Sequence, residues 1–294
     1  MHGDQLEVTV DVVRRLVAEQ HPRWAGLPVR EVAAVGTVNA VFRLGDGLAV
    51  RMPLRRRDPA EVRAELEAER DAMVELVAAT AVPTPVPVAL GEPGDGYPLP
   101  WSVQTWLPGR DAVVVDPAAS TRFARDLARL VLELRATSTR GRRFTGSGRG
   151  GHLPDHDAAV EAYLLAGAHL LDVDRLGRTW ERLRTLPREA PDAMTHGDLV
   201  PGNVLVEDGR LAGVLDGGGL GPADPALDLV GAWHLLDAGP RAELRRALGC
   251  GDLEWARGRA WAFQQALGLV GYYEHSHPTM SRLGRRTLAR LLED

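Results

Sequence analysis

The spacing of apolar residues divides the chain into a first part with short strands and a longer, mostly helical second part. Residues 8–20 carry valine and leucine at helical spacing, and residues 59–79 form a second helical stretch rich in Ala, Glu and Arg. Short strands are expected at 38–44, 48–52, 86–90 and 101–107. The turn Gly45-Asp46-Gly47 between the first two of these predicts a hairpin.

Beyond Pro108-Gly109 the pattern favours helices over nearly all of the remaining chain. Helices are predicted at 117–137, 157–171, 174–186, 224–237, 240–248, 252–273 and 278–292. One β-rich stretch interrupts them at 203–216. We therefore predict an α+β protein in which a β-rich N-terminal lobe (1–104) passes through a hinge (105–109) into a helical C-terminal lobe (110–294).

Composition narrows the class of protein. Of its 294 residues 45% are apolar and 26% charged, as in soluble globular proteins, and the net charge of −5 disfavours a nucleic-acid partner. The chain has a single cysteine, no apolar run of roughly 18 residues, and no basic segment leading into an apolar stretch at its start. These features predict a cytoplasmic location without a membrane partner. All 35 basic residues are arginine, so any site that usually needs lysine must use arginine here.

The most informative segment is the loop His196–Asn203, which precedes the predicted β-rich stretch. Asn203 follows Asp198 by five residues, and Asp216 follows Asn203 by thirteen. Phosphoryl transfer needs a carboxylate near the acceptor hydroxyl and oxygen ligands for Mg²⁺. The spacing matches the catalytic loop and following aspartate of the protein-kinase-like fold. Each residue alone has a structural explanation as a turn or strand-end residue, but the three together indicate a kinase.

The same motifs, together with several stretches in the first lobe, resemble the aminoglycoside phosphotransferase family. The resemblance rests on His196-Gly197-Asp198 through Asn203, Leu215-Asp216, Asp224-Pro225-Ala226-Leu227-Asp228, Gly36–Gly45 and Val50-Arg51-Met52-Pro53. It implies a protein-kinase-like bilobal fold and an ATP- and Mg²⁺-dependent O-phosphotransferase, with GTP as the other possible donor. It also implies an aminoglycoside or related antibiotic as the acceptor. We expect a monomer or weak homodimer.

The resemblance also implies roles for the motif residues. Asp198 would be the catalytic base or the carboxylate that orients the acceptor, and Asn203 and Asp216 would bind Mg²⁺. The support residues of the loop would be His196, Asp224 and Asp228. The position of the kinase Asp-Phe-Gly motif is here Asp216-Gly217-Gly218, which lacks the phenylalanine of regulated kinases and suggests an enzyme that is always active.

On the nucleotide side, the position of the phosphate-binding lysine is occupied by Arg51. Arginine can bind phosphate through two donors, and its carboxylate partner would be Glu69, with Glu65 one turn earlier as the alternative. The resemblance further implies phosphate contacts from Thr37 and Asn39 and adenine contacts from the Thr105 carbonyl and the Leu107 N–H.

The acceptor is least defined by sequence. A polycationic antibiotic needs acidic side chains, and the candidates are Asp157, Glu161, Asp237 and Glu274, each of which can equally be a solvated surface charge. A macrolide, a sugar or a choline-like metabolite is an alternative acceptor, and a weakly active nucleotide-binding pseudokinase is an alternative function. The pairs His152/His156 and His275/His277 lack the further ligands of a transition-metal site. The Arg149-Gly150-Gly151 loop resembles a feature of one branch of the family, and the sequence assigns it no role.

Overall fold

The computed structural model describes residues 6–32, 38–146, 148–274 and 278–293. The chain forms two compact units. The first contains Met1–Ala78, Pro83–Pro108 and Asp216–Gly218. The second contains Ala79–Val82, Gly109–Leu215 and Gly219–Asp294.

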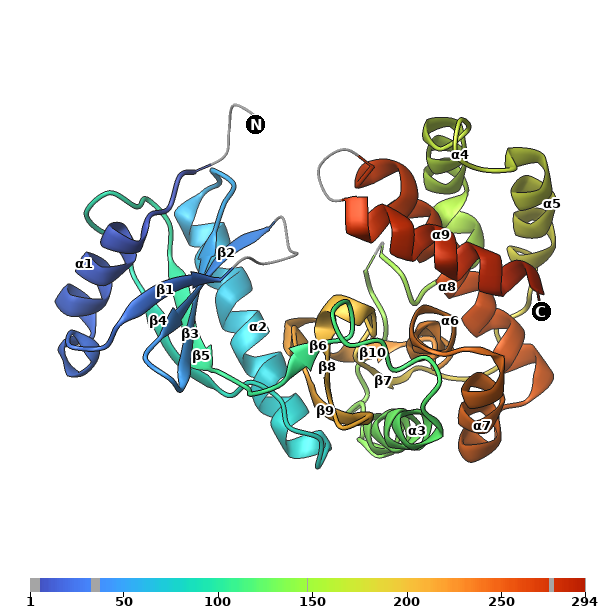
Figure 1. Ribbon diagram of the computed structural model, residues 1–294, viewed down its shortest axis with the longest axis horizontal. Coiled ribbons are helices and arrows are strands. Elements are labelled where there is room, and N and C mark those ends of the chain that lie inside the picture. Colours follow the sequence, from blue (N-terminus) through green and yellow to red (C-terminus); the bar gives the residue numbers. More distant parts are fainter. Residues whose placement is uncertain (1–5, 33–37, 147, 275–277, 294) are drawn as a thin grey trace. The chain divides into compact units, whose positions relative to one another are not determined.

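The first unit is built on a five-stranded antiparallel sheet with the strand order β1-β2-β3-β5-β4 (Figure 1). Its strands are β1 (Val29–Val32), β2 (Asn39–Leu44), β3 (Leu48–Pro53), β4 (Pro87–Gly91) and β5 (Trp101–Thr105). The predicted hairpin joins β2 to β3, and Leu44 pairs with Leu48 across the turn. Gly45, the first residue of the turn, has a φ of +60°, a conformation that glycine adopts without strain.

Two helices, α1 (Val10–Gln20) and α2 (Pro59–Ala79), complete the first unit. Both contribute to one apolar core with the sheet, α1 through Val13 and Leu16 and α2 through Val62 and Leu66. Trp101 of β5 is fully buried in this core, and its Nε1 donates to the Glu92 carbonyl at 3.1 Å. The core fixes β3 and α2, which carry Arg51 and Glu69.

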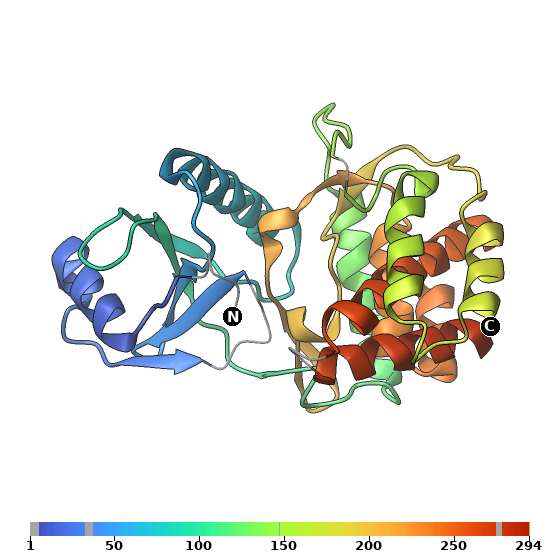
Figure 2. The ribbon, with the colours of Figure 1, turned by 90° about the horizontal axis from the view of Figure 1, so that it is seen from above.

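The second unit is mainly helical, with two small sheets. Its helices are α3 (Thr121–Ala136), α4 (Asp157–Ala166), α5 (Val173–Leu183), α6 (Val230–Leu235), α7 (Ala238–Leu248), α8 (Asp252–Tyr272) and α9 (Pro278–Glu293). Its strands are β6 (Arg110–Asp111), β7 (Ala193–Thr195), β8 (Val204–Glu207), β9 (Arg210–Val214) and β10 (Gly221–Ala223). The sheets have the orders β6-β8-β9 and β10-β7. The helix α8 packs along α9 and also contacts α4, α5 and α6 (Figures 1 and 2). None of the described helices has the length and apolar composition of a membrane-spanning segment.

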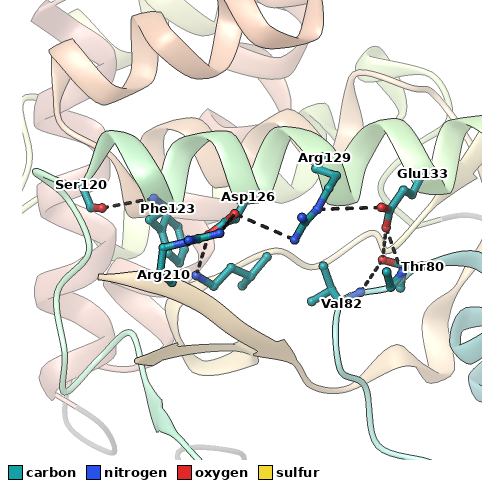
Figure 3. Close-up of polar contacts among 10 residues, drawn as sticks. Thr80, Val82, Ser120, Phe123, Asp126, Arg129, Glu133 and Arg210 are labelled. Atoms are coloured by element: carbon teal, nitrogen blue, oxygen red, sulfur yellow. Dashed lines mark hydrogen bonds and ion pairs between the residues drawn. The ribbon is translucent and has the colours of Figure 1, made fainter. Parts of the chain in front are cut away.

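The helix α3 anchors the β8–β9 hairpin through polar contacts (Figure 3). The Ser120 side chain caps α3 by accepting from the Phe123 N–H at 3.1 Å, and it donates to the Gly209 carbonyl at 2.6 Å. One turn on, Asp126 accepts from Arg210 Nε at 2.5 Å and Nη2 at 2.8 Å. Burial alone would raise the pKa of Asp126, but the Arg210 guanidinium and the Leu211 N–H lower it below its ordinary value. Asp126 therefore stays ionised and holds the hairpin that begins after Asn203.

The same helix fixes a short connecting segment (Figure 3). The Glu133 carboxylate accepts from the Thr80 hydroxyl and, at 3.1 Å, from the Ala81 N–H. The Thr80 hydroxyl oxygen in turn accepts from the Val82 N–H at 3.0 Å. Residues 79–82 are thereby tied to the second unit, although the chain on either side belongs to the first.

One predicted helix is wrong in part. Residues 224–237 do not form a single helix, because helical structure begins only with a 3₁₀ turn at Leu227–Leu229 and continues as α6. The Asp224 carboxylate accepts from the Ala226 N–H at 3.0 Å and from two side chains of α8, which holds the first residues outside a helix. The prediction also missed β6, β7 and β10, which are two or three residues long and too short to show alternation.

Candidate active site

The loop from His196 to Asn203 connects β7 to β8, and buried polar groups hold it in place. The Asp228 carboxylate is 2% exposed and accepts from the His196 N–H at 2.9 Å and the Gly197 N–H at 2.8 Å. Burial raises the pKa of Asp228, although His196 and these two N–H donors oppose the shift. His196 Nε2 lies 2.9 Å from the Leu215 carbonyl, and its Nδ1 lies 3.3 Å from the Asp198 N–H. Both bonds form if the imidazole is neutral with its proton on Nε2.

Asp224 supports the same region from a buried position. Its Oδ2 accepts from Arg257 Nε at 2.9 Å and Nη2 at 2.6 Å, and from Trp261 Nε1 at 2.9 Å. Arg257 also donates to the Leu186 carbonyl at 2.7 Å. These contacts fasten the segment before α6 to α8, so Asp224 has a structural environment in which its charge is paired.

Three side chains of the second unit converge on the carboxylate of Asp198. Arg149 Nη2 donates to Oδ1 at 2.7 Å, and Gln265 Nε2 donates to the same oxygen at 2.5 Å. Asn203 Nδ2 donates to Oδ2 at 2.8 Å and to the Asp198 carbonyl at 3.0 Å. These hydrogen bonds hold the Asp198 side chain in place, and because it is 37% exposed it remains accessible. The Leu215 N–H donates to the Asn203 carbonyl at 2.8 Å, which fixes the residue before Asp216 beside Asn203.

In the first unit, Arg51 of β3 lies between two carboxylates. Its Nη2 donates to Asp216 Oδ1 at 2.9 Å, and its Nη1 is 3.7 Å from Glu69 Oε2. Burial raises the pKa of Glu69 above its ordinary value. The positive charge of Arg51 lowers this pKa to a smaller extent, and the negative charge of Asp216 raises it further. The alternative partner, Glu65, instead pairs with Arg57 at 2.6 Å. The structure thus brings together Arg51, Glu69 and Asp216.

The backbone after Asp216 packs tightly on α2. A Cβ added at Gly218 would lie 2.8 Å from Glu69 Cγ, and one added at Gly217 would collide with the Leu76 side chain. The Leu76 side chain therefore occupies the space that a side chain at position 217 would enter. Asp216 itself has a φ of +58°, a strained value for a residue with a side chain.

Of the other residues predicted to contact the nucleotide, Asn39 and Thr105 lie in the first sheet and Leu107 follows it. Asn39 begins β2, and Thr105 ends β5, where its N–H donates to the Val86 carbonyl at 2.9 Å and its hydroxyl accepts from the Val86 N–H at 2.8 Å. Leu107 follows Trp106, whose N–H donates to the Gly47 carbonyl at 2.8 Å. Thr37 lies outside the described residues.

Three of the four acidic candidates for the acceptor are paired with cations or histidine. Asp157 accepts from Arg184 Nε at 2.8 Å and from Trp180 Nε1 at 2.8 Å, and Arg184 lowers its pKa. Asp237 pairs with Arg290 at 2.6 Å, and Glu274 lies 2.8 Å from His169 Nε2. Glu161 is exposed on α4.

The described residues contain no cluster of three or more His, Cys, Asp or Glu side chains suited to a metal ion. His152 Nδ1 lies 3.3 Å from Asp155 Oδ1, and the His156 ring packs edge-on against Trp261 at 5.3 Å. His275 and His277 lie outside the described residues.

Sequence reasoning missed two of the three donors to Asp198. Gln265 is in the middle of α8 and belongs to no motif, and the sequence shows Arg149 only as part of a glycine-containing loop. Arg149 precedes Asp198 by 49 residues and Gln265 follows it by 67, so only the folded chain brings them together.

Several solved structures are similar to this chain over nearly their whole length. Aminoglycoside 2'-phosphotransferase-IIIa, in its GDP complex, superimposes with a TM-score of 0.71 at 18% identity, covering 97% of this chain and 99% of that chain. Macrolide 2'-phosphotransferase MphH from Brachybacterium faecium gives 0.62 at 21% identity, covering 94% and 98%. The streptomycin–ATP complex of APH(2")-IIa gives 0.59 at 15% identity, covering 98% of each chain. At these identities the likeness establishes the fold, and it confirms the predicted protein-kinase-like α+β class.

No curated protein matches the chain in sequence at a significant level. The sequence profile of the "Phosphotransferase enzyme family" matches residues 29–261, well over half of the chain. The chain therefore belongs to this family of phosphotransferases, which confirms both the resemblance and the enzyme class predicted from its motifs.

Proposed function

We propose that this protein transfers the γ-phosphoryl group of ATP to a hydroxyl group of a small molecule, with Mg²⁺ as the cofactor. The observation that carries the proposal is the carboxylate of Asp198. Three donors hold it, yet its side chain remains 37% exposed. A fixed, accessible carboxylate is what an acceptor hydroxyl needs to be oriented and to lose its proton.

The donor set is chemically suited to Mg²⁺ and a nucleotide. Asn203 uses its Nδ2 for Asp198, which leaves the amide oxygen for a metal, and Asp216 supplies a carboxylate. Oxygen atoms of this kind are the ligands Mg²⁺ prefers, and the bound ion would neutralise charge on the phosphates. Arg51 would bind the phosphates with Glu69 orienting it, because its guanidinium offers donors beyond the one that contacts Asp216.

Other assignments complete the proposal. Adenine would contact the Thr105 carbonyl and the Leu107 N–H, and Thr37 and Asn39 would contact phosphate. Residues 1–104 would bind the nucleotide, 105–109 would act as a hinge, and 110–294 would provide the catalytic loop and the acceptor site. His196, Asp224 and Asp228 would support the loop. We further propose a cytoplasmic monomer or weak homodimer.

An aminoglycoside or related antibiotic is the first acceptor to test, because similar structures are complexes with kanamycin, gentamicin and streptomycin. Asp157, Glu161, Asp237 and Glu274 would contribute the acidic contacts. A macrolide comes next, since two similar structures are macrolide 2'-phosphotransferases. Sugars and choline-like metabolites complete the panel. ATP and GTP should be compared as donors, because GDP and ATP both occur in the similar structures.

The test is an acceptor panel with nucleoside diphosphate release as the readout, followed by analysis of the product. The Asp198→Asn variant should lose transfer by a factor on the order of 10²–10⁴ while still binding ATP with Mg²⁺, since general-base catalysis contributes about this much. Nucleotide binding without turnover on any acceptor would favour the pseudokinase alternative. Full activity of Asp198→Asn would remove Asp198 from the reaction.

A further inference from the structure

The Arg149-Gly150-Gly151 loop lies against the segment that leads to Asp224. Gly150 has a φ of +103°, and a Cβ at this position would lie 2.6 Å from the Cβ of Ala223. The Gly150 carbonyl accepts from the Asp224 N–H at 2.8 Å. A Cβ at Gly151 would likewise lie 2.6 Å from the ring of Phe144. The two glycines thus allow a close backbone approach that fixes the loop on which Arg149 stands.

The side chain of Arg149 reaches Asp198 from this fixed position. Its Nη2 donates to Oδ1 at 2.7 Å, while its Nε is buried with no partner in the described part of the chain. The guanidinium carries five N–H donors, so most of them remain for another acceptor. Both side chains are partly exposed, 33% for Arg149 and 37% for Asp198, so a bound molecule can contact the pair.

The contacts also determine which oxygen of Asp198 is free. Oδ1 receives donors from both Arg149 and Gln265, which occupy its two lone pairs. Oδ2 receives Asn203 Nδ2 and keeps one lone pair. A substrate hydroxyl that bonds to Asp198 therefore donates to Oδ2. The hydroxyl and the Arg149 guanidinium then contact the two oxygens of the same carboxylate, so both lie next to Asp198.

We propose, on the basis of the phosphotransferase function proposed above, that Arg149 is a catalytic residue that stabilises the phosphoryl group during transfer. The acceptor oxygen forms a bond to the γ-phosphorus as the bond from that phosphorus to the β–γ bridging oxygen breaks. The nucleoside diphosphate leaves with the electron pair, and the hydroxyl proton passes to Asp198 Oδ2. Negative charge on the transferred phosphoryl oxygens is met by the Arg149 guanidinium. The ion pair with Asp198 holds the arginine ready before substrate binds.

The first test compares Arg149→Gln, Arg149→Lys and Arg149→Ala with the exposed control Arg143→Gln. The activities measured are transfer to any acceptor that the wild type phosphorylates and hydrolysis of ATP by water. Arg149→Gln should lower kcat by a factor on the order of 10²–10³ with little change in the KM for ATP, as for loss of one preorganised charge-stabilising group. Arg149→Lys should retain part of the activity, because it keeps the charge without the planar fork. Guanidinium ion at a low, non-denaturing concentration should partly restore Arg149→Ala, which a merely structural role would not allow.

The second test needs no acceptor. Fluoroaluminate with ADP and Mg²⁺ mimics the phosphoryl group in the transition state of transfer. It should therefore increase the affinity of the wild type and of Arg143→Gln for ADP. The Arg149→Gln variant should bind ADP alone as tightly as the wild type does. The increase in ADP affinity caused by fluoroaluminate should be at least tenfold smaller in this variant. Wild-type kcat and full tightening in Arg149→Gln would overturn the role of Arg149 and leave the proposed function standing. A wild-type protein with neither transfer, hydrolysis nor tightening would overturn both.

Discussion

The burial of His234 predicts a loss of stability in mild acid. This side chain of α6 is 1% exposed, and its Nδ1 lies 3.0 Å from the Thr287 hydroxyl. Burial lowers its pKa to about 3, helped by the nearby charges of Arg149, Arg290 and Arg286. The unfolded chain binds this proton near pH 6.5, whereas the folded chain does not bind it until about pH 3. Stability linked to His234 is therefore intact above pH 6.5 and falls as the pH drops from 6.5 towards 3.

The magnitude follows from the shift. Each pH unit below 6.5 costs about 1.4 kcal/mol, so lowering the pH from 7.5 to 5.0 should destabilise the protein by about 2 kcal/mol through His234 alone. Urea unfolding at both pH values measures it, for wild type and for His234→Gln. Between pH 7.5 and 5.0, the free energy of unfolding of His234→Gln should fall by about 2 kcal/mol less than that of the wild type, whatever the variant's stability at pH 7.5. The exposed control His152→Gln should keep the wild-type drop. An equal drop in wild type and His234→Gln would refute the reasoning.

Two further predictions concern packing and charge. Arg257→Met should cost about 3–5 kcal/mol in urea unfolding, because it leaves the buried Asp224 carboxylate without its cation, whereas Arg125→Met in an exposed pair should cost about 1 kcal/mol or less. A small loss in both would contradict the pairing seen for Asp224. Gly217→Ala should weaken Mg²⁺–ATP binding about tenfold or more, measured with a fluorescent nucleotide, because its Cβ overlaps Leu76. Adding Leu76→Ala should restore binding, and the absence of rescue would mean that this overlap is not the cause.

The fold class and the position of the loop at 196–203 before a β-rich stretch could be predicted because their signals are local. The helix predicted at 59–79 has the bounds of α2, because a long segment rich in Ala, Glu and Arg strongly favours a helix. The loop from Asp198 to Asn203 is a short contiguous motif, so it can be recognised without knowledge of the fold. Family membership follows from such segments.

The rest of the site could not be predicted because it depends on long-range packing. Arg149 reaches Asp198 only when Gly150 docks beside Ala223, and Gln265 reaches it only when α8 crosses the second unit. The spacing of apolar residues over 224–237 predicts a continuous helix. It contains no sign that the Asp224 carboxylate bonds to side chains of α8, which holds this residue outside the helix. The charges of Asp157 and Asp237 made them candidates, but the sequence does not show that Arg184, just after α5, and Arg290, in α9, pair with them.

The interleaving of the two units along the chain has a practical consequence for dissecting the protein. Residues 216–218 pack within the first unit although more than a hundred residues separate them from its sheet, and residues 79–82 belong to the second unit although the first surrounds them in sequence. No single cut in the chain therefore separates the two units. A recombinant piece ending near residue 108 would lack Asp216, Gly217, which packs against Leu76, and Gly218, which packs against Glu69. Nucleotide affinity measured on such a piece would therefore understate that of the intact enzyme, and swapping halves between family members would divide this structural element between two parents.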